Sequence, residues 1–178
     1  MLTESSRQRL LLLARESVAA RVCKRPSPLL PIANPLPASG VFVTVKHRGM
    51  LRGCLGTLEP VEDLAPEVAR CAADAASQDP RFKPMTPDEL PDLSVDVSVL
   101  GPLEAIDPRD ATAIVIGEHG LVVEQGRYRG VLLPQVASER KWTREQFIRQ
   151  TCVKASLAPD AWEHGAIVYR FSAEVFGD

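Results

Sequence analysis

The sequence predicts an α+β protein in which an antiparallel sheet, mixed at most, packs against flanking helices. Two observations predict this class. Strand-like segments occur in pairs separated by short turn sequences, and amphipathic segments of helical period lie between the pairs. Strands that are joined by a tight turn pair antiparallel, so we expect the helices to lie alongside the sheet instead of linking parallel strands.

Length and composition are typical of a globular chain. The 178 residues are 45% hydrophobic and 25% charged, with a formal net charge of -2, so nucleic acid is not expected as a partner. No apolar run reaches the ~20 residues of a membrane-spanning helix, and no membrane partner is expected. The start MLTESSRQRL lacks the apolar core of a signal peptide. The four cysteines form no C-x-x-C pair, which indicates free thiols in a cytoplasmic protein.

The N-terminal part predicts a helix over residues 3–25 and a proline-rich strap over 26–37. Thr3 is a suitable N-cap, and Lys24 and Arg25 suit the negative end of a helix. The five prolines of RPSPLLPIANPLP cannot continue a helix, which indicates an extended segment across the surface. The apolar stripe of the helix is expected to consist of Leu11, Ala14, Val18 and Val22.

Residues 41–46 and 51–58 predict a β-hairpin that carries the sequence LRGCLGT. A three-residue turn over 47–49, with Gly49 left-handed, places the apolar side chains of both strands on one face. That face is expected to hold Val41, Val43, Val45, Leu51, Gly53 and Leu55. Cys54 then lies on the opposite face, together with Arg52 and Lys46.

Residues 63–99 predict a helix, an irregular segment and a strand. Asp63 begins the helix, and its alanine-rich run to Ala76 allows close approach to a sheet. In the segment DPRFKPMTPDEL, Thr86 and Glu89 form a capping box. Residues 93–99 then alternate apolar and polar side chains, the pattern of a strand with one buried face.

The last third of the chain predicts a second hairpin, a helix and a final strand. Gln125 and Gly126 form the expected two-residue turn, with Glu124 opposite Arg127. Thr143 caps the helix. The expected buried positions are Ile148, Thr151, Cys152 and Ala155 in the helix and Ile167, Tyr169, Phe171 and Val175 in the strand.

Cys54 is the first candidate for chemistry. A thiol acts as a nucleophile only as the thiolate, which neighbouring cations favour. Arg52 lies roughly 6.5 Å away along the strand on the same face, and Gly56 leaves open space beside the sulfur. Cys54 is therefore assigned as catalytic, with Arg52, Gly53 and Gly56 as substrate-binding residues. The alternative is structural, with a small apolar thiol and glycines that relieve a crossing with the alanine-rich helix.

Three further residues are candidates. His119 would be a catalytic general base or the partner of a thiolate, or else a His-Gly turn before a strand. The Gln135 amide would orient a substrate carbonyl or carboxylate, or else bond the backbone at a helix start. Arg81 is assigned to substrate binding, although a local salt bridge to Asp79 accounts for it too.

No motif for a known cofactor is evident. The sequence contains no phosphate-binding loop, no dinucleotide fingerprint and no paired Cys/His spacing. A structural zinc is therefore not expected, while a metal assembled from distant residues stays open.

Six motifs occur in order from Val41 to the C-terminus: LRGCLGT, DPRF, SVDVSVLGPLE, GEHGLVV, GVLLPQVASER and TCVKASL. Together they resemble those of the AMMECR domain family, whose prokaryotic members are called AmmeMemoRadiSam system protein A. The family often has isoleucine where this chain has Leu55, and glycine where it has Ser156. The resemblance identifies residues 41–178 as the family-like core of one domain that spans 1–178.

The resemblance implies a larger and a smaller lobe around a cleft that the motifs line. It also implies association with a Memo-like protein and a radical SAM protein, and it supplies no reaction. We consider two functions. In the first, the protein is a cysteine-dependent enzyme or thiol carrier. In the second, it is a non-catalytic module that binds a small molecule or peptide within a multiprotein complex.

Overall fold

The computed structural model describes residues 2–28 and 37–178, which divide into two compact units. The first unit comprises Met1–Leu100 with Glu174–Asp178, and the second comprises Gly101–Ala173. Both units combine antiparallel strands with helices, which confirms the predicted α+β class. The single domain over 1–178 and the cleft between two lobes stay predictions.

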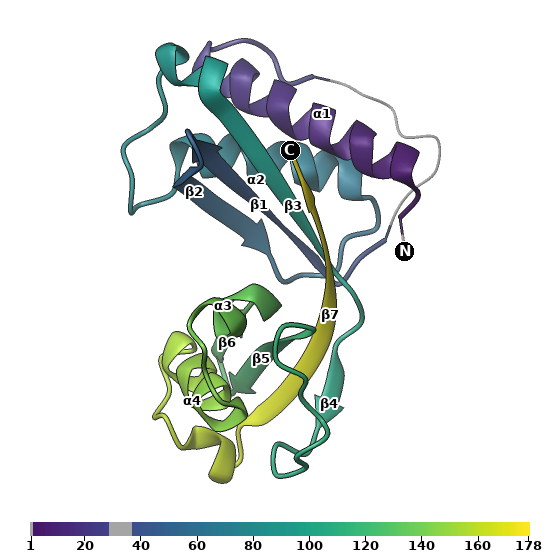
Figure 1. Ribbon diagram of the computed structural model, residues 1–178, viewed down its shortest axis with the longest axis vertical. Helices are drawn as coiled ribbons and strands as arrows, with labels where there is room; N and C mark the ends of the chain where they lie inside the picture. The colour runs from purple at the N-terminus through teal and green to yellow at the C-terminus, as the bar shows by residue number, and fades with distance from the viewer. Residues whose placement is uncertain (1, 29–36) are drawn as a thin grey trace. The chain divides into compact units, whose positions relative to one another are not determined.

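In the first unit, two helices pack on one sheet (Figure 1). Strands β2 (Met50–Thr57), β1 (Gly40–His47) and β3 (Leu93–Leu100) are antiparallel neighbours in that order. Helices α1 (Glu4–Val22) and α2 (Leu64–Ser77) pack against each other and against these strands. The core between helices and sheet includes Leu10, Val18, Val41, Val43, Val45, Leu64, Val68, Val95 and Val97.

Helix α1 begins at its predicted cap, and two of its four expected stripe positions, Ala14 and Val18, are buried. The Thr3 hydroxyl accepts a hydrogen bond of 3.2 Å from the backbone N–H of Ser6. Leu11 and Val22, which were expected in the stripe, are only half-buried. The buried positions are Leu10, Leu13, Ala14, Ser17, Val18 and Ala20, so the stripe is rotated by about one position. Among the described residues, no helix is both long and apolar enough to cross a lipid bilayer.

The C-terminal end of α1 comes earlier than residue 25. Lys24 adopts a left-handed backbone with a φ of 54°, and the N–H of Arg25 bonds back to the carbonyl of Ala20 at 2.8 Å. This pattern closes the helix at Val22 and satisfies its last carbonyl groups. The predicted strap over 26–37 includes residues 29–36, which lie outside the described residues.

The first hairpin has a shorter turn than predicted. His47 pairs with Met50, so the turn consists of Arg48 and Gly49. Both are left-handed, with φ values of 52° and 75°. A two-residue turn of this kind matches the twist of the two strands, which explains why it replaces the expected three-residue turn.

A β-bulge at Arg52 changes the face on which Leu51 lies. Val45 pairs with Gly53, whereas Lys46 pairs with Leu51, so Arg52 is an extra residue in β2. Because side chains alternate along a strand, the bulge moves Leu51 to the face of Lys46, where it is 43% exposed. The prediction that Leu51 belongs to the apolar face is therefore wrong.

Helix α2 and the segment after it follow the prediction. The Asp63 carboxylate caps the helix by accepting the N–H of Ala65 at 3.3 Å. Thr86 and Glu89 form the expected capping box, and it begins a short 3-10 helix, η1 (Pro87–Asp92).

In the second unit, four strands and two α-helices enclose a separate core (Figure 1). Strands β4 (Glu104–Ile106), β7 (Ile167–Gly177), β5 (His119–Gln125) and β6 (Tyr128–Leu132) are antiparallel neighbours in that order. Helices α3 (Pro134–Glu139) and α4 (Arg144–Lys154) pack against β5 and β6, and a 3-10 helix, η2 (Ala161–Glu163), precedes β7. The core includes Leu121, Val123, Phe147, Ile148, Cys152 and Val168.

The second hairpin turns one residue later than predicted. Gln125 pairs with Tyr128, so the turn is 126–127, and its glycine has a φ of 60°. Glu124 consequently faces Arg129, and their side chains form an ion pair of 3.6 Å.

The last helix follows the prediction, and the last strand does not. Helix α4 has the expected Thr143 cap, and its predicted stripe is buried. In β7, Val168 and Phe171 are buried, whereas Ile167 and Val175 are exposed. Ile167 and Val168 both pair with β5 inside the second unit, and the buried face there begins at Val168, not at Ile167. The last residues of β7 belong to the first unit.

Candidate functional site

Cys54 lies in the middle of β2, at the edge of the first unit's sheet. It pairs with Thr44 of β1, and the Thr44 hydroxyl donates a hydrogen bond of 3.3 Å to Cys54 Sγ. The two side chains are close because the Cys54 N–H points away from β1, which makes this a non-hydrogen-bonded pair. The half-buried sulfur therefore faces a hydroxyl donor on its own sheet face.

A buried carboxylate, Asp79, holds the free edge of β2 at Cys54. Its Oδ2 accepts the backbone N–H of Cys54 at 2.9 Å and Nη2 of Arg81 at 2.7 Å. Its Oδ1 accepts Nε and the backbone N–H of Arg81 at 3.0 and 3.1 Å. The Arg81 guanidinium holds the pKa of Asp79 well below its ordinary range; burial acts in the opposite direction, and the Cys54 N–H adds to the lowering. Asp79 is thus ionised, and each of its two carboxylate oxygens accepts two hydrogen bonds.

The sequence around Asp79 explains how Arg81 is placed. The segment Asp79–Phe82 forms a turn in which the N–H of Phe82 donates to the Asp79 carbonyl at 3.1 Å, with Pro80 in the position that proline favours. The Arg81 guanidinium lies 5.4 Å from the centroid of the Phe82 ring, and the Arg81 side chain is 56% exposed.

Arg81 is linked to Cys54 through Asp79, because Asp79 Oδ2 accepts both Nη2 of Arg81 and the backbone N–H of Cys54. The hydrogen bond to Asp79 raises the pKa of Arg81, burial lowers it, and the Cys54 thiolate adds a smaller effect in the raising direction. The local salt bridge that the sequence predicted is confirmed, and a substrate contact by Arg81 stays a prediction.

Arg52, which was expected beside the sulfur, is bound to other groups. Its Nε and Nη2 donate to the two carboxylate oxygens of Glu89 at 2.6 and 3.0 Å. Its Nη1 and Nη2 also donate to the carbonyls of residues 83–84 at 2.8 and 3.4 Å. Because these partners occupy the guanidinium, Arg52 ties the bulge of β2 to η1. Its predicted role in holding a substrate is not tested by these contacts.

The two glycines of LRGCLGT are required by packing. A Cβ at Gly53 would collide with the backbone carbonyl oxygen of Ala75 in α2, which confirms that this glycine relieves a crossing with the alanine-rich helix. A Cβ at Gly56 would collide with the carbonyl of Val41 and the ring of Phe42. The space that Gly56 was expected to leave open is therefore filled by Phe42, and substrate binding by either glycine stays a prediction.

His119 lies in the second unit as the first residue of β5. Its Nδ1 accepts a hydrogen bond of 3.0 Å from the backbone N–H of Val115. The neutral ring then carries its proton on Nε2, so that nitrogen donates a hydrogen bond and does not accept a proton. The alternative of a left-handed His-Gly turn is wrong, because His119 is not among the described residues with positive φ.

Gln135 lies in the second unit, in the first turn of α3. Its side-chain oxygen Oε1 is buried and accepts no hydrogen bond within the part of the chain that the structure describes. The backbone bond that was the alternative for this oxygen is therefore absent there. A buried amide oxygen without a donor is unfavourable by itself, so it invites a donor from a ligand or water.

The predicted constellation is thus distributed over both units. Cys54 and Arg81 belong to the first unit, whereas His119 and Gln135 belong to the second. Their meeting in one site stays a prediction. Sequence reasoning missed the roles of Thr44 and Asp79, although the Asp-Pro-Arg turn was a usable signal for a fixed carboxylate.

The other cysteines have different environments. Burial raises the pKa of Cys71 to about 11 and also raises the pKa of Cys152, so neither is a reactive thiol at neutral pH. Cys23 is exposed at the end of α1, and no cysteine is paired. Within residues 2–28 and 37–178, no group of three or more His, Cys, Asp and Glu side chains is arranged to hold a metal ion.

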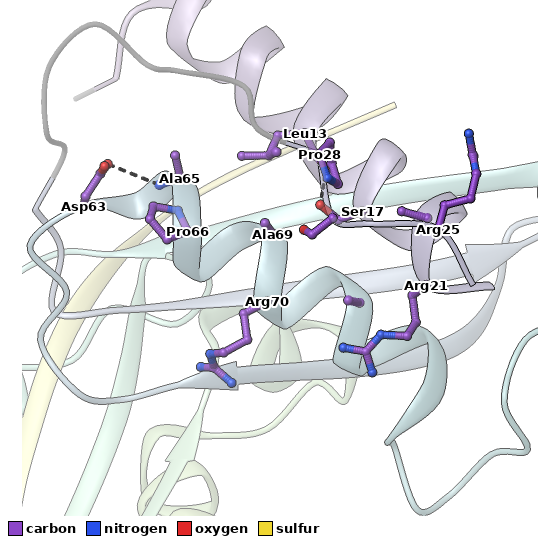
Figure 2. Close-up of a pocket in the computed structure, with 13 residues that line it drawn as sticks. Leu13, Ser17, Arg21, Arg25, Pro28, Asp63, Ala65, Pro66, Ala69 and Arg70 are labelled. Atoms are coloured by element: carbon purple, nitrogen blue, oxygen red, sulfur yellow. Dashed lines mark hydrogen bonds between the residues drawn. The ribbon is translucent and has the colours of Figure 1, made fainter. Parts of the chain in front are cut away.

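A groove of about 930 Å³ lies between α1 and α2 (Figure 2). A small apolar cluster of Leu13, Ala65 and Ala69 lines it. Three arginines, Arg21, Arg25 and Arg70, lie around this cluster. The described lining of the groove includes none of the predicted site residues.

Comparisons with known proteins lead to one family. A family model described as AMMECR1 matches residues 11–176. A protein of Methanothermobacter thermautotrophicus is 48% identical over 142 residues, which cover 77% of this chain and 74% of the relative. A protein of Methanosarcina mazei is 39% identical over 186 residues, which cover 99% of this chain and 93% of the relative. The crystal structure of the uncharacterized protein PH0010 from Pyrococcus horikoshii matches with a TM-score of 0.90 and 36% identity, over 99% of this chain and 93% of that one.

Proposed function

This chain belongs to the AMMECR1 family, and on that premise we propose that Cys54 is a working thiol, either the nucleophile of an enzyme or the attachment point of a thiol carrier. One observation carries the proposal. The Cys54 sulfur receives the Thr44 hydroxyl, and the same buried carboxylate, Asp79, holds both the Cys54 backbone and the Arg81 guanidinium.

These contacts suit a working thiol. A hydroxyl donor and a nearby cation both stabilise negative charge on sulfur, and a half-buried thiol remains within reach of a small reagent. In the reaction, Sγ forms a bond to an electrophilic atom of the substrate. The leaving group departs with the electron pair of the bond that breaks, and the thiol proton passes to that group through solvent.

The family resemblance suggests the partners of this protein, and its cysteines suggest its compartment. We expect the protein to act with a Memo-like protein and a radical SAM protein, and co-purification of the three would support this. Four unpaired cysteines favour a reducing, cytoplasmic compartment.

The test is the rate of alkylation of each cysteine by iodoacetamide, followed by mass spectrometry across a pH series. Cys54 should react faster near neutral pH than the exposed Cys23 and than a free model thiol, while Cys71 and Cys152 stay unlabelled. Thr44→Val removes the hydroxyl with little change of shape, so it should slow Cys54 and leave Cys23 unchanged. If Cys54 reacts no faster than the model thiol, the proposal fails.

The groove between α1 and α2 favours the second function, a ligand-binding module. Its apolar lining suits the hydrocarbon part of an amphipathic ligand, and Arg25 lies beside it to meet an anionic group. Arg21 and Arg70 contribute less, because both are shared with Asp74. The ligand class is an amphipathic anion, and no chemistry at Cys54 is required.

A fluorescent anion distinguishes the two functions. The probe 1-anilinonaphthalene-8-sulfonate should bind the wild-type protein and lose binding in Ala69→Trp, which fills the groove. Val153→Trp, at an exposed position of α4, is the matched control. Cys54→Ser should leave this binding and complex assembly intact while abolishing any thiol-dependent activity. Equal binding by the wild type and Ala69→Trp would exclude the groove.

A further inference from the structure

We infer that Asp79 is a positioning residue that holds Arg81 beside Cys54, and that Arg81 thereby gives this thiol a preference for anionic electrophiles. The inference rests on the proposed function, in which Cys54 is the working thiol. It adds the chemical class of the substrate, and it assigns to Asp79 a role that is exerted only through Arg81.

Asp79 fixes the Arg81 guanidinium at two points. Nε donates to Oδ1 at 3.0 Å and Nη2 donates to Oδ2 at 2.7 Å, a fork that sets the plane of the guanidinium as well as its distance. The backbone N–H of Arg81 also donates to Oδ1, and the Phe82 ring packs near the guanidinium. Because the Asp79 side chain is only 2% exposed, water competes weakly with these bonds.

The same carboxylate connects Arg81 to Cys54. Oδ2 accepts both Nη2 of Arg81 and the backbone N–H of Cys54, so a single oxygen atom joins the guanidinium to the residue that carries the thiol. Arg81 cannot move away from β2 without breaking its bonds to Asp79.

Arg81 keeps donors for a ligand. The described residues supply hydrogen-bond partners for its Nε and Nη2 and none for Nη1, and the side chain is more than half exposed. A guanidinium with free N–H groups and a fixed plane is suited to a carboxylate or phosphate oxygen. The electrophile that reaches Cys54 is therefore expected to carry an anionic group.

The neighbouring cations, Arg52 and Lys46, are already bound to other groups of the protein. Arg52 is occupied by Glu89 and by two backbone carbonyls. Lys46, on the same sheet face as Cys54, forms an ion pair with Asp96. Of these three cations, Arg81 is the one that Asp79 links to Cys54 and that is fixed in place yet open to a ligand.

The experiment compares two alkylating reagents that differ in charge. Iodoacetate carries a carboxylate and iodoacetamide is neutral, and both react with the same sulfur. The ratio of their rate constants at Cys54, divided by the same ratio for an uncharged model thiol, measures the preference for an anion. We expect this normalised ratio to be about threefold or more in the wild type, because the Arg81 cation, which shares Asp79 Oδ2 with the Cys54 backbone, attracts the carboxylate.

Variants distinguish the positioning of Arg81 by Asp79 from a general loss of structure. Arg81→Gln should bring the normalised ratio to about one. Asp79→Asn keeps an acceptor for the Cys54 N–H but loses the charge that holds Arg81, so it should lower the ratio as far as Arg81→Gln does. The double variant should show no further loss, and Asp79→Glu should restore part of the preference. Arg48→Gln, which removes an exposed arginine at the hairpin turn, is the matched control.

The outcomes for this inference and for the proposed function differ. If Cys54 reacts with neither reagent faster than a model thiol, the proposed function fails. If Cys54 is fast but its normalised ratio is about one, or does not fall in Asp79→Asn, the proposed function stands and this inference fails.

If the Asp79 variants do not fold, a measurement on the wild-type protein still tests the inference. Solvent exchange of the Arg81 Nε–H, followed by NMR, should be slower than that of Arg48, whose carboxylate partner Asp92 is exposed. Equal exchange at the two arginines would contradict a fixed guanidinium.

Discussion

Arg52 and Glu89 form a two-point ion pair in which Nε meets Oε1 at 2.6 Å and Nη2 meets Oε2 at 3.0 Å. The two side chains are 19% and 14% exposed, and Arg52 holds the pKa of Glu89 below its ordinary value. The pair joins residues that are 37 positions apart in the chain. It therefore acts as a clasp between the bulge of β2 and the start of η1.

Removing one member of this pair should destabilise the first unit. Arg52→Gln leaves the Glu89 carboxylate largely buried without its partner, so we expect the free energy of unfolding to fall by about 1–3 kcal/mol. Urea unfolding measures the change. Arg48→Gln is the control, because its ion pair with Asp92 is exposed, and it should change the free energy of unfolding much less. Equal losses in the two variants would argue against the clasp.

A side chain at position 53 should not be tolerated. Gly53→Ala places a Cβ against the backbone of Ala75, so β2 and α2 must move apart, and we expect a loss of about 1–3 kcal/mol. Gly49→Ala is the control, because no atom lies within 4 Å of its added Cβ and only its positive φ is unfavourable. Thermal unfolding should show a lower Tm for Gly53→Ala than for Gly49→Ala, and the reverse order would disprove the crossing.

Asp79 should make stability depend on pH in the acid range. Its pKa in the folded state lies below the ordinary value of 3.8, so its contribution is fully present above that value. The contribution is lost as the pH falls from there through the folded pKa. The difference in unfolding free energy between the wild type and Asp79→Asn should therefore be constant near neutral pH and shrink in acid. A difference that grows in acid would show that the sign is wrong.

His119 should be found as the tautomer with its proton on Nε2. The Val115 N–H occupies Nδ1, so nitrogen chemical shifts of the neutral ring should show an unprotonated Nδ1. Heteronuclear NMR of the labelled protein measures this directly, with the exposed His164 as a reference. A proton on Nδ1 would break the bond to Val115 and would free Nε2 to act as the general base that the sequence suggested.

Ser156→Gly should stabilise the second unit. Ser156 follows α4 with a left-handed φ of 61°, and the N–H of Leu157 closes the helix end on the carbonyl of Cys152 at 2.9 Å. Glycine adopts this backbone without strain, so the free energy of unfolding should rise by about 0.5–1 kcal/mol. Lys154→Gly, inside the helix, should lower it by a similar amount.

Much of the local structure could be predicted from the residues themselves. The caps at Thr3, Asp63 and Thr143 were predicted correctly, as was the sheet face of Cys54. Caps and face alternation depend on side chains a few positions apart, which a single sequence displays directly. The bulge at Arg52 was missed, because nothing in LRGCLGT distinguishes an extra residue from a paired one.

The sequence by itself determined the α+β class, the family, and the thiol as the candidate for chemistry, because periodicity, caps and ordered motifs are local properties. Only the tertiary structure decided which charge accompanies that thiol. The nearest arginine in the chain is bound to Glu89, and the arginine near the sulfur comes from a turn whose carboxylate is 25 positions from Cys54. Electrostatic partners are chosen by distance in space, and packing of α2 against the sheet sets that distance.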